Sequence, residues 1–397
     1  MCFAHYFSLF LYSDKTFYLS IIVIVTVFSF PFSASSMHKY TMSKTSYDIL
    51  KSKFRGCLLG SLLGDCLGAP FEGDNMTTGD KLVIKNYLDK LEEPGFKCPF
   101  KPYTDDTAMT RSVAKALIDK PEPDFKFLAK LFVKEYFLEP NRGYGQNVVS
   151  VFQKLRQNKF EDVFKPASEQ FNGSGSLGNG GAMRIAPVAL YYFDKYNIMI
   201  DVVTNATKIT HTNPLGVNGA LLQSIAIQEC LLEPQGEKLN VHNFVKKLLD
   251  KMKVFEYEDE DDLDGVIEEP YREKLLTVQN LLLRTYDQDE LYDEILETLG
   301  NSIVALNSVP TAVYCFLKAC AETPDLRNIF RNTIEYAIGL GGDTDTIASM
   351  AGAIAGAYVG EENLNVNLVR HCEKHNEIIE MADNLLAARQ EIEKKVS

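Results

Sequence analysis

The sequence predicts an all-α protein with one compact helical domain over residues 47–397. Apolar residues recur at helical spacing throughout this region, and strand-like alternation is scarce. Clusters of Gly, Pro and Asn separate the periodic segments, as they do between successive helices. The chain has 397 residues, of which 46% are hydrophobic and 24% charged, so it can fill a large apolar core. This composition excludes a disordered or collagen-like protein.

The first 46 residues are expected to form an N-terminal extension outside this domain. Residues 17–32 are an apolar run, followed by the small and polar residues 33–36. The run is shorter than the ~20 residues of a spanning helix, so stable membrane insertion is not expected. Two interpretations stay open: a targeting segment, or an upstream extension of the true start, because Met37 and Met42 come just before the domain.

Helical periodicity begins at Tyr47, and helices are predicted around Phe54, around Val113 and around Phe132. The acidic stretch Glu256 to Asp264 interrupts the pattern and predicts a solvated loop, because like charges at that density resist packing. The further segments that show helical periodicity are 215–232, 241–253, 271–284, 290–306, 309–321, 327–340, 346–359 and 375–394.

Charge and cysteine usage limit the partners and the compartment. There are 41 Lys and Arg against 54 Asp and Glu, a net charge of −13, so the chain repels polyanions and direct nucleic-acid binding is not expected. An anionic ligand would need local positive charge from metal ions, helix N-termini or backbone amides. The eight cysteines form no C-x-x-C pair and indicate free thiols in a reducing compartment.

We therefore expect an intracellular protein in the cytoplasm, nucleus or mitochondrion. A real targeting segment at residues 1–36 would instead direct the chain to the secretory pathway or to an organelle. His371 and His375 have the i, i+4 spacing of a metal-binding pair on a helix, but their polar neighbours favour a solvated helix face.

The first cluster with chemical potential runs from Gly56 to Glu72. Its glycines recur at four-residue steps, which indicates a close helix–helix contact. Glu72 follows a Gly and a Pro that end the helix, so we expect its carboxylate on a loop, where it is free to move.

Two further clusters offer carboxylates at the starts of helices. Thr104, Asp105 and Asp106 precede one helix, where a Thr or Asp could simply cap it. Asp343, Asp345 and Thr346 open another helix more than 200 residues later in the chain. Adjacent carboxylates repel each other, and this set offers only hard oxygen ligands, which suit Mg²⁺. If the clusters meet in space, they could hold two ions.

The glycine-rich segment between Phe171 and Arg184 is the remaining cluster. Its backbone amides can hold a diphosphate without a lysine, although a flexible connector is the alternative. The formal G-x-G-x-x-G at Gly173 follows no buried strand, so a dinucleotide-binding fold is not predicted. His211 could be a satisfied buried histidine or a ligand contact.

Together these motifs resemble the ADP-ribosylglycohydrolase family, over roughly residues 53–390. Within that family the chain is similar to the animal subtype that removes serine-linked ADP-ribose and degrades poly(ADP-ribose). The stretches that carry the resemblance are FRGCLLGSLLGDCLG, YTDDTAM, NRGYG, FNGSGSLGNGGAMR, THTNPLG, SVPTAVYCFL and LGGDTDTIASMAGAIAGAYVG.

The resemblance implies a compact orthogonal helical bundle with two Mg²⁺ ions, for which Mn²⁺ is a substitute. It implies that one ion is held by Thr104, Asp105 and Asp106 and the other by Asp343, Asp345 and Thr346. It also makes Glu72 the flap glutamate, a ligand and the catalytic residue. The substrate-binding positions it implies are Asp105, Gly143, Phe171, Ser174, Gly175, Ser176, Leu177, Gly178, Asn179, Gly180, His211 and Ile303. Leu177 stands where the animal subtype has a Tyr, which implies a weaker aromatic contact to adenine.

The implied activity is Mg²⁺-dependent hydrolysis of the glycosidic bond at the distal ribose, which releases ADP-ribose from serine-linked proteins and from the polymer. The implied partners are these substrates, and a monomer is expected. Two alternatives stay open: a catalytically silent member that binds ADP-ribose or serves structurally, and a hydrolase of arginine-linked ADP-ribose. Retention of all the acidic ligands argues against the silent member.

Overall fold

The computed structural model describes residues 44–120, 122–234, 237–256, 269–284 and 288–396. All of them belong to one compact unit. The predicted N-terminal extension lies outside these residues except for residues 44–46, which begin the first helix, and so does all of the acidic loop except Glu256. Glu256 itself ends a helix, and its carboxylate accepts hydrogen bonds from the backbone N–H groups of Tyr271 and Arg272.

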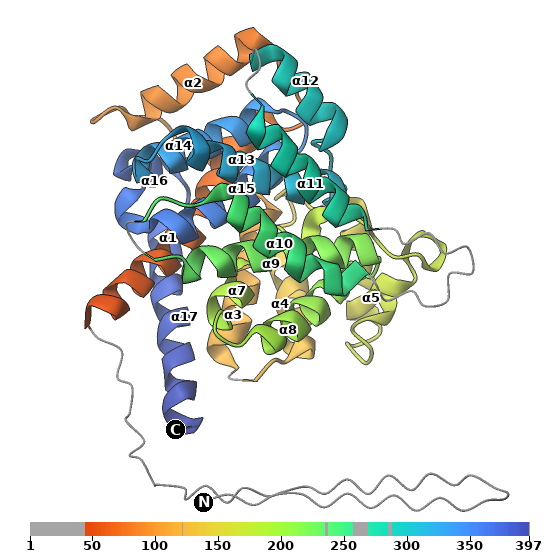
Figure 1. Cartoon of the computed structure of the whole chain (residues 1–397). Coiled ribbons are helices and arrows are strands. Elements are labelled where there is room, and N and C mark those ends of the chain that lie inside the picture. The colour runs from red at the N-terminus through yellow and green to blue at the C-terminus, as the bar shows by residue number, and fades with distance from the viewer. Residues whose placement is uncertain (1–43, 121, 235–236, 257–268, 285–287, 397) are drawn as a thin grey trace, which may run out of the picture. The chain divides into compact units, whose positions relative to one another are not determined.

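The prediction of an all-α fold is confirmed, because the described residues form α-helices and short 3-10 helices with no strand (Figure 1). The α-helices are α1 (Lys44–Gly68), α2 (Thr78–Glu92), α3 (Asp105–Asp119), α4 (Phe125–Leu138), α5 (Gln146–Gln157), α6 (Lys165–Ser168), α7 (Ala186–Tyr191), α8 (Tyr196–Lys208), α9 (Pro214–Leu232), α10 (Val241–Glu256), α11 (Pro270–Leu283), α12 (Gln288–Thr298), α13 (Val309–Glu322), α14 (Leu326–Gly339), α15 (Thr344–Val359), α16 (Val366–His371) and α17 (His375–Val396). The 3-10 helices are η1 (Ala69–Phe71), η2 (Gln170–Gly173), η3 (Asn179–Gly181), η4 (Ala305–Asn307) and η5 (Glu361–Asn363).

Helices α1 and α15 form the central antiparallel pair (Figure 1). Small residues face each other along it, with Gly60 against Gly352 and Gly64 against Ala348. A Cβ atom added to Gly60 would lie 2.0 Å from the Gly352 carbonyl oxygen, so only glycine permits this approach. At the end of the pair, the Thr344 hydroxyl donates to the Gly68 carbonyl at 2.9 Å. The segment after α1 therefore lies beside the start of α15.

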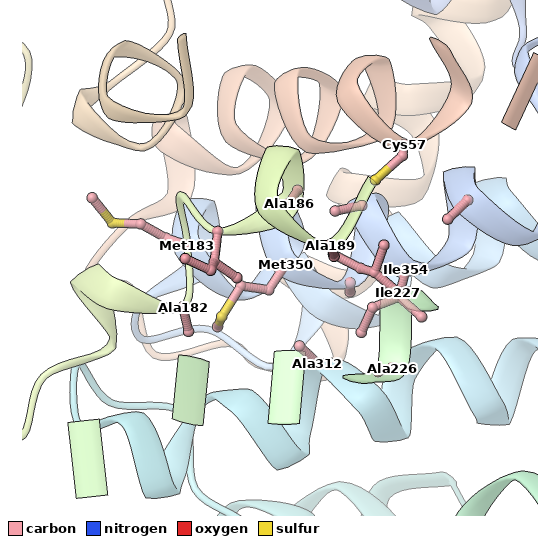
Figure 2. Close-up of a cluster of buried hydrophobic side chains, with 14 of the residues drawn as sticks. Cys57, Ala182, Met183, Ala186, Ala189, Ala226, Ile227, Ala312, Met350 and Ile354 are labelled. Atoms are coloured by element: carbon pink, nitrogen blue, oxygen red, sulfur yellow. The ribbon is translucent and has the colours of Figure 1, made fainter. Parts of the chain in front are cut away.

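Several helices contribute side chains to the buried core shown in Figure 2. Cys57 from α1, Ala189 from α7, Ile227 from α9, Ala312 from α13 and Ile354 from α15 point toward one another there. Helix α9 is long and apolar enough to cross a membrane, but 83% of its most apolar window is buried inside the fold, as expected of a core helix. The core thus fixes the helices whose ends carry the acidic motifs.

Two local predictions are wrong. The helix predicted over 290–306 stops at Thr298, because Gly300 takes a positive φ of 88° and its N–H returns to the Ile295 carbonyl. The predicted helical pair His371 and His375 is split between α16 and α17. His371 is buried with Nδ1 3.3 Å from the Cys98 sulfur, so it is neither half of a helical metal pair nor on a solvated face.

Candidate active site

The structure brings the acidic starts of α3 and α15 into contact. Thr104 caps α3, and its hydroxyl oxygen accepts a hydrogen bond from the Asp106 N–H, so the capping role considered for it is real. Asp343 is the residue before α15, whose first turn contains Asp345 and Thr346. The Thr346 hydroxyl donates to Asp106 Oδ2 at 3.2 Å, across 240 residues of sequence. The two motifs therefore form one site.

Glu72 completes a group of three carboxylates. One oxygen each from Glu72, Asp343 and Asp345 lies within 4.8 Å of the others, with Glu72 exposed and both aspartates buried. Glu72 follows η1, as expected from the Gly and Pro before it. Two backbone hydrogen bonds hold the segment after it against Gly342: Gly73 N–H to Gly342 O at 2.8 Å, and Gly342 N–H to Asp74 O at 3.0 Å.

Gly341 and Gly342 make this approach possible. Both take positive φ angles, 69° and 70°, which L side chains rarely adopt. A Cβ on Gly341 would lie 2.5 Å from the Asp74 carbonyl oxygen, and one on Gly342 would lie 2.3 Å from the Asn301 carbonyl oxygen. The glycine pair before Asp343 is thus required by the packing of two loops at the site.

Burial and mutual repulsion raise the pKa values of the aspartates at the site above the ordinary value for an aspartate. Burial, with the neighbouring Asp343 next in importance, raises the pKa of Asp345 to about 9. Burial and then Asp65 raise the pKa of Asp105 to about 7, and burial and then Asp345 raise that of Asp106. Asp106 Oδ1 is buried without a hydrogen-bond partner among the described residues. A hard divalent cation fits this donor set, because it would offset the repulsion and satisfy that oxygen.

Asp65 supports the acidic site from α1, and the sequence analysis did not identify it. It lies fully buried in α1, and its carboxylate accepts hydrogen bonds from Thr104 N–H at 2.9 Å and from Thr107 N–H at 3.0 Å. The Thr107 hydroxyl also donates to it, at 2.5 Å. Asp65 therefore fixes the start of α3, where Asp105 and Asp106 begin. The signal was present in the sequence, because Asp65 is the sole charged residue after Arg55 in the run that ends at Gly68.

The glycine-rich segment is attached to the acidic site through its neighbours. Asn179 N–H donates to the Ile303 carbonyl at 2.9 Å, and Ala305 N–H to the Leu177 carbonyl at 3.0 Å. The Asn179 side chain donates to Asp343 Oδ2 at 2.6 Å. This amide therefore orients a predicted metal ligand, an interaction that the sequence did not indicate.

A cavity of about 340 Å³ contains most of the predicted site residues. That size suits a small-molecule ligand. The predicted residues that line it are Glu72, Asp105, Asp106, Gly143, Ser176, Gly178, Asn179, Gly180, His211, Ile303, Asp343, Asp345 and Thr346. The predicted residues outside its lining are Thr104, Phe171, Ser174, Gly175 and Leu177. Phe171 and Leu177 are exposed.

Several residues that line the cavity were not predicted. They come from the start of α5, which the sequence analysis did not identify, and from several other segments: Met109, Gln146, Asn147, Val148, Gln170, Met183, Arg184 and Thr210. Arg184 is the charged member of this set, and it is fully buried. Burial and the Arg184 guanidinium lower the pKa of His211 to about 3, so this imidazole is neutral.

The fold and the site define a member of a known enzyme family. Residues 46–395 match the family model described as ADP-ribosylglycohydrolase, and the chain belongs to this family. It is 43% identical over 349 residues to the ADP-ribosylhydrolase ARH3 of Gallus gallus, covering 84% of this chain and 92% of that protein. It is 42% identical over 347 residues to the protein of the same name from Homo sapiens, with 84% and 93% covered.

A solved structure supports the fold. The chain aligns with an "ADP-ribosylglycohydrolase-related protein complex" at a TM-score of 0.59, covering 86% of this chain and 99% of that one. Their sequences are 20% identical, so this likeness shows the common all-α fold alone.

Proposed function

We propose that this chain is a Mg²⁺-dependent hydrolase that cleaves the glycosidic bond at the distal ribose of serine-linked ADP-ribosylated proteins and of poly(ADP-ribose), with release of ADP-ribose. The observation that carries the proposal is the meeting of α3 and α15 through Thr346 and Asp106 at one cavity. Membership of the ADP-ribosylglycohydrolase family and the similarity to ADP-ribosylhydrolase ARH3 support the substrate class.

The acidic residues would hold two Mg²⁺ ions, with Mn²⁺ as a substitute. Thr104, Asp105 and Asp106 would hold one, and Asp343, Asp345 and Thr346 the other. The buried Asp106 Oδ1 without a hydrogen-bond partner supports this assignment. When bound, such ions supply positive charge that polarises ribose oxygens and water.

Glu72 is the proton-handling residue in this proposal. Bond cleavage at the anomeric carbon develops positive charge on the ribose and negative charge on the departing oxygen. Glu72 is the exposed member of the carboxylate group, and burial and then Asp343 raise its pKa. A carboxyl group with a raised pKa can hold a proton for the departing oxygen or take one from water.

The glycine-rich segment would bind the diphosphate and the adenosine end of the ligand. Ser176, Gly178 and Gly180 line the cavity, and buried Arg184 supplies a positive charge beside it. The exposed apolar side chains of Phe171 and Leu177 lie on the same segment and are available to the adenine.

The test compares three substrates, each with and without EDTA: a peptide with serine-linked ADP-ribose, a peptide with arginine-linked ADP-ribose, and the polymer. We expect ADP-ribose to be released from the serine-linked peptide and from the polymer, and EDTA to stop both reactions. Release from the arginine-linked peptide alone would contradict the proposed substrates and would show a hydrolase of arginine-linked ADP-ribose instead. Binding of ADP-ribose without release from any substrate would show a silent member of the family.

A further inference from the structure

A fully buried guanidinium lies behind the glycine-rich segment. Arg184 follows this segment, and its NH1 group donates to the Gly180 carbonyl at 2.8 Å. Its NH2 group donates to the Thr210 hydroxyl oxygen at 2.7 Å, and the guanidinium lies 4.7 Å from the centre of the Phe132 ring. No carboxylate of the described residues forms an ion pair with it. Burial lowers the pKa of Arg184 to about 9, and the Asp105 carboxyl group only partly opposes this shift, so burying this guanidinium without an ion pair is costly.

The hydroxyl group of Thr210 links Arg184 to His211. A guanidinium can only donate hydrogen bonds, so the Thr210 oxygen accepts from Arg184 and its own proton is left to donate. Among the described residues the other hydrogen-bond partner of this hydroxyl is His211 Nδ1, 2.7 Å away. The hydroxyl therefore donates to Nδ1.

This hydrogen bond decides where the imidazole carries its proton. A neutral imidazole has one N–H group, and a ring nitrogen that accepts a hydrogen bond is not protonated. His211 is neutral because burial and Arg184 lower its pKa, so its proton is on Nε2. A Cβ on Gly180 would lie 3.0 Å from Nε2, and one on Gly178 would lie 3.4 Å from it. All three residues line the cavity, so this N–H lies beside the glycine-rich backbone, where a ligand would bind.

We propose that Arg184 and Thr210 are positioning residues that hold His211 as its Nε2–H tautomer, ready to donate a hydrogen bond to a diphosphate oxygen of the ligand. An ionised diphosphate oxygen can only accept hydrogen bonds, so it matches a fixed donor. It also adds negative charge near buried Arg184, which forms no ion pair with the described residues. The identity of the ligand rests on the proposed function, whereas the tautomer does not.

The first measurement needs no ligand. Long-range ¹H–¹⁵N correlation spectra distinguish the protonated from the unprotonated ring nitrogen of a neutral histidine, and His211→Asn identifies the resonances. We expect Nε2 to be protonated in the wild-type protein and in Thr210→Ser, which keeps the hydroxyl. Thr210→Val keeps the shape without the hydroxyl, and we expect it to populate the Nδ1–H tautomer. Protonated Nδ1 in the wild-type protein would overturn the proposal, whether or not any variant folds.

The second measurement is ADP-ribose affinity by calorimetry, together with kcat and KM. We expect Thr210→Val to weaken binding about tenfold, the effect of losing one hydrogen bond to a charged group, with kcat changed much less. Thr210→Ser should bind like the wild type. An unchanged affinity in Thr210→Val would contradict the proposal. A wild-type protein that neither binds ADP-ribose nor releases it would contradict the proposed function instead, and the spectra would then decide the tautomer alone.

Discussion

At the residue scale, the carboxyl groups of the site differ in their exposure to solvent. Asp106, Asp343 and Asp345 are buried and close to one another, whereas Glu72 reaches the same group from an exposed loop. Burying carboxylates without a neighbouring positive charge costs folding free energy. These aspartates are therefore suited to holding metal ions. An exposed carboxyl group with a raised pKa is suited to moving a proton.

Glu72→Gln tests this division of roles. The amide keeps the shape of the side chain but cannot exchange a proton, so we expect turnover to fall by about 10²–10⁴-fold, the usual contribution of a general acid or base. Binding of ADP-ribose should change little. Glu161→Gln makes the same chemical change on the surface away from the cavity, and should leave turnover intact. Full turnover in Glu72→Gln would remove Glu72 from the chemistry.

His211 gives a pH prediction at the same scale. Its pKa in the folded protein is lowered to about 3 by burial and by Arg184, against ~6.5 in an unfolded chain. As the pH falls, the unfolded state therefore takes up a proton on this ring before the folded state does. The stability contributed by neutral His211 is fully present above pH ~6.5 and is lost as the pH falls toward 3. We expect its ring resonances to stay constant between about pH 8 and about pH 5 and to titrate in the urea-unfolded chain. A midpoint near ~6.5 in the folded protein would contradict the buried, neutral state of this ring.

At the element scale, the pairing of α1 with α15 positions the helix ends that carry the acidic residues of the site. Small residues along both helices bring the backbones together, and the contact ends at Gly68 and Thr344, next to Glu72 and Asp343. The positions of these carboxylates therefore depend on helix packing some distance from the cavity.

Gly60→Ala tests this packing. The new methyl group would lie 2.0 Å from the Gly352 carbonyl oxygen, so the helices must separate, and we expect the free energy of unfolding to fall by about 3 kcal/mol or more. Gly79→Ala is the control, because a Cβ there meets nothing closer than 3.6 Å and alanine favours a helix. Urea unfolding measures both. Equal stability of the two variants would show that the close approach is not required.

The same elements show what the sequence could and could not predict. Strong periodicity identified α9, α13 and α15 nearly to their ends, and the acidic motifs were recognised from residue type and spacing. The sequence did not indicate which hydrogen-bond partners the polar groups of the site would have. Asp65 accepts a hydrogen bond at the start of α3, and the Asn179 side chain donates one to Asp343. Such partners are chosen by tertiary packing between distant segments, which local patterns do not contain.

Helix α5 was missed for a related reason. It carries three buried residues, Val151, Phe152 and Leu155, on a polar surface helix, so its apolar signal is short. Its start lines the cavity, and the residues there were missed with it. Ile303 lines the cavity, although the helix predicted around it is a loop.

At the scale of the whole molecule, the chain has a net charge of −13 and concentrates several of its acidic residues at one cavity. Such a centre is least stable without cations, because the repulsion among its carboxylates opposes folding. Binding of Mg²⁺ to the folded state alone should therefore stabilise the whole domain.

A thermal unfolding series tests this coupling. We expect saturating Mg²⁺ to stabilise the wild-type protein by about 2–3 kcal/mol, the linkage expected near 100 times the Kd. Asp345→Asn removes one ligand and the cost of burying a carboxyl group whose pKa is raised to about 9, so without Mg²⁺ it should unfold at a higher temperature than the wild type and respond weakly to the ion. Asp250→Asn changes an exposed acid on α10 and should respond like the wild type. A full Mg²⁺ response in Asp345→Asn would exclude that residue as a ligand.

The most direct test of the central claim, that acidic residues distant in sequence form one divalent-cation centre, is anomalous diffraction from crystals of the protein grown with Mn²⁺. The account predicts two strong anomalous peaks between the Asp105–Asp106 pair and the Asp343–Asp345 pair, both absent in crystals treated with EDTA. Peaks confined to surface acids, with none between these aspartates, would contradict it.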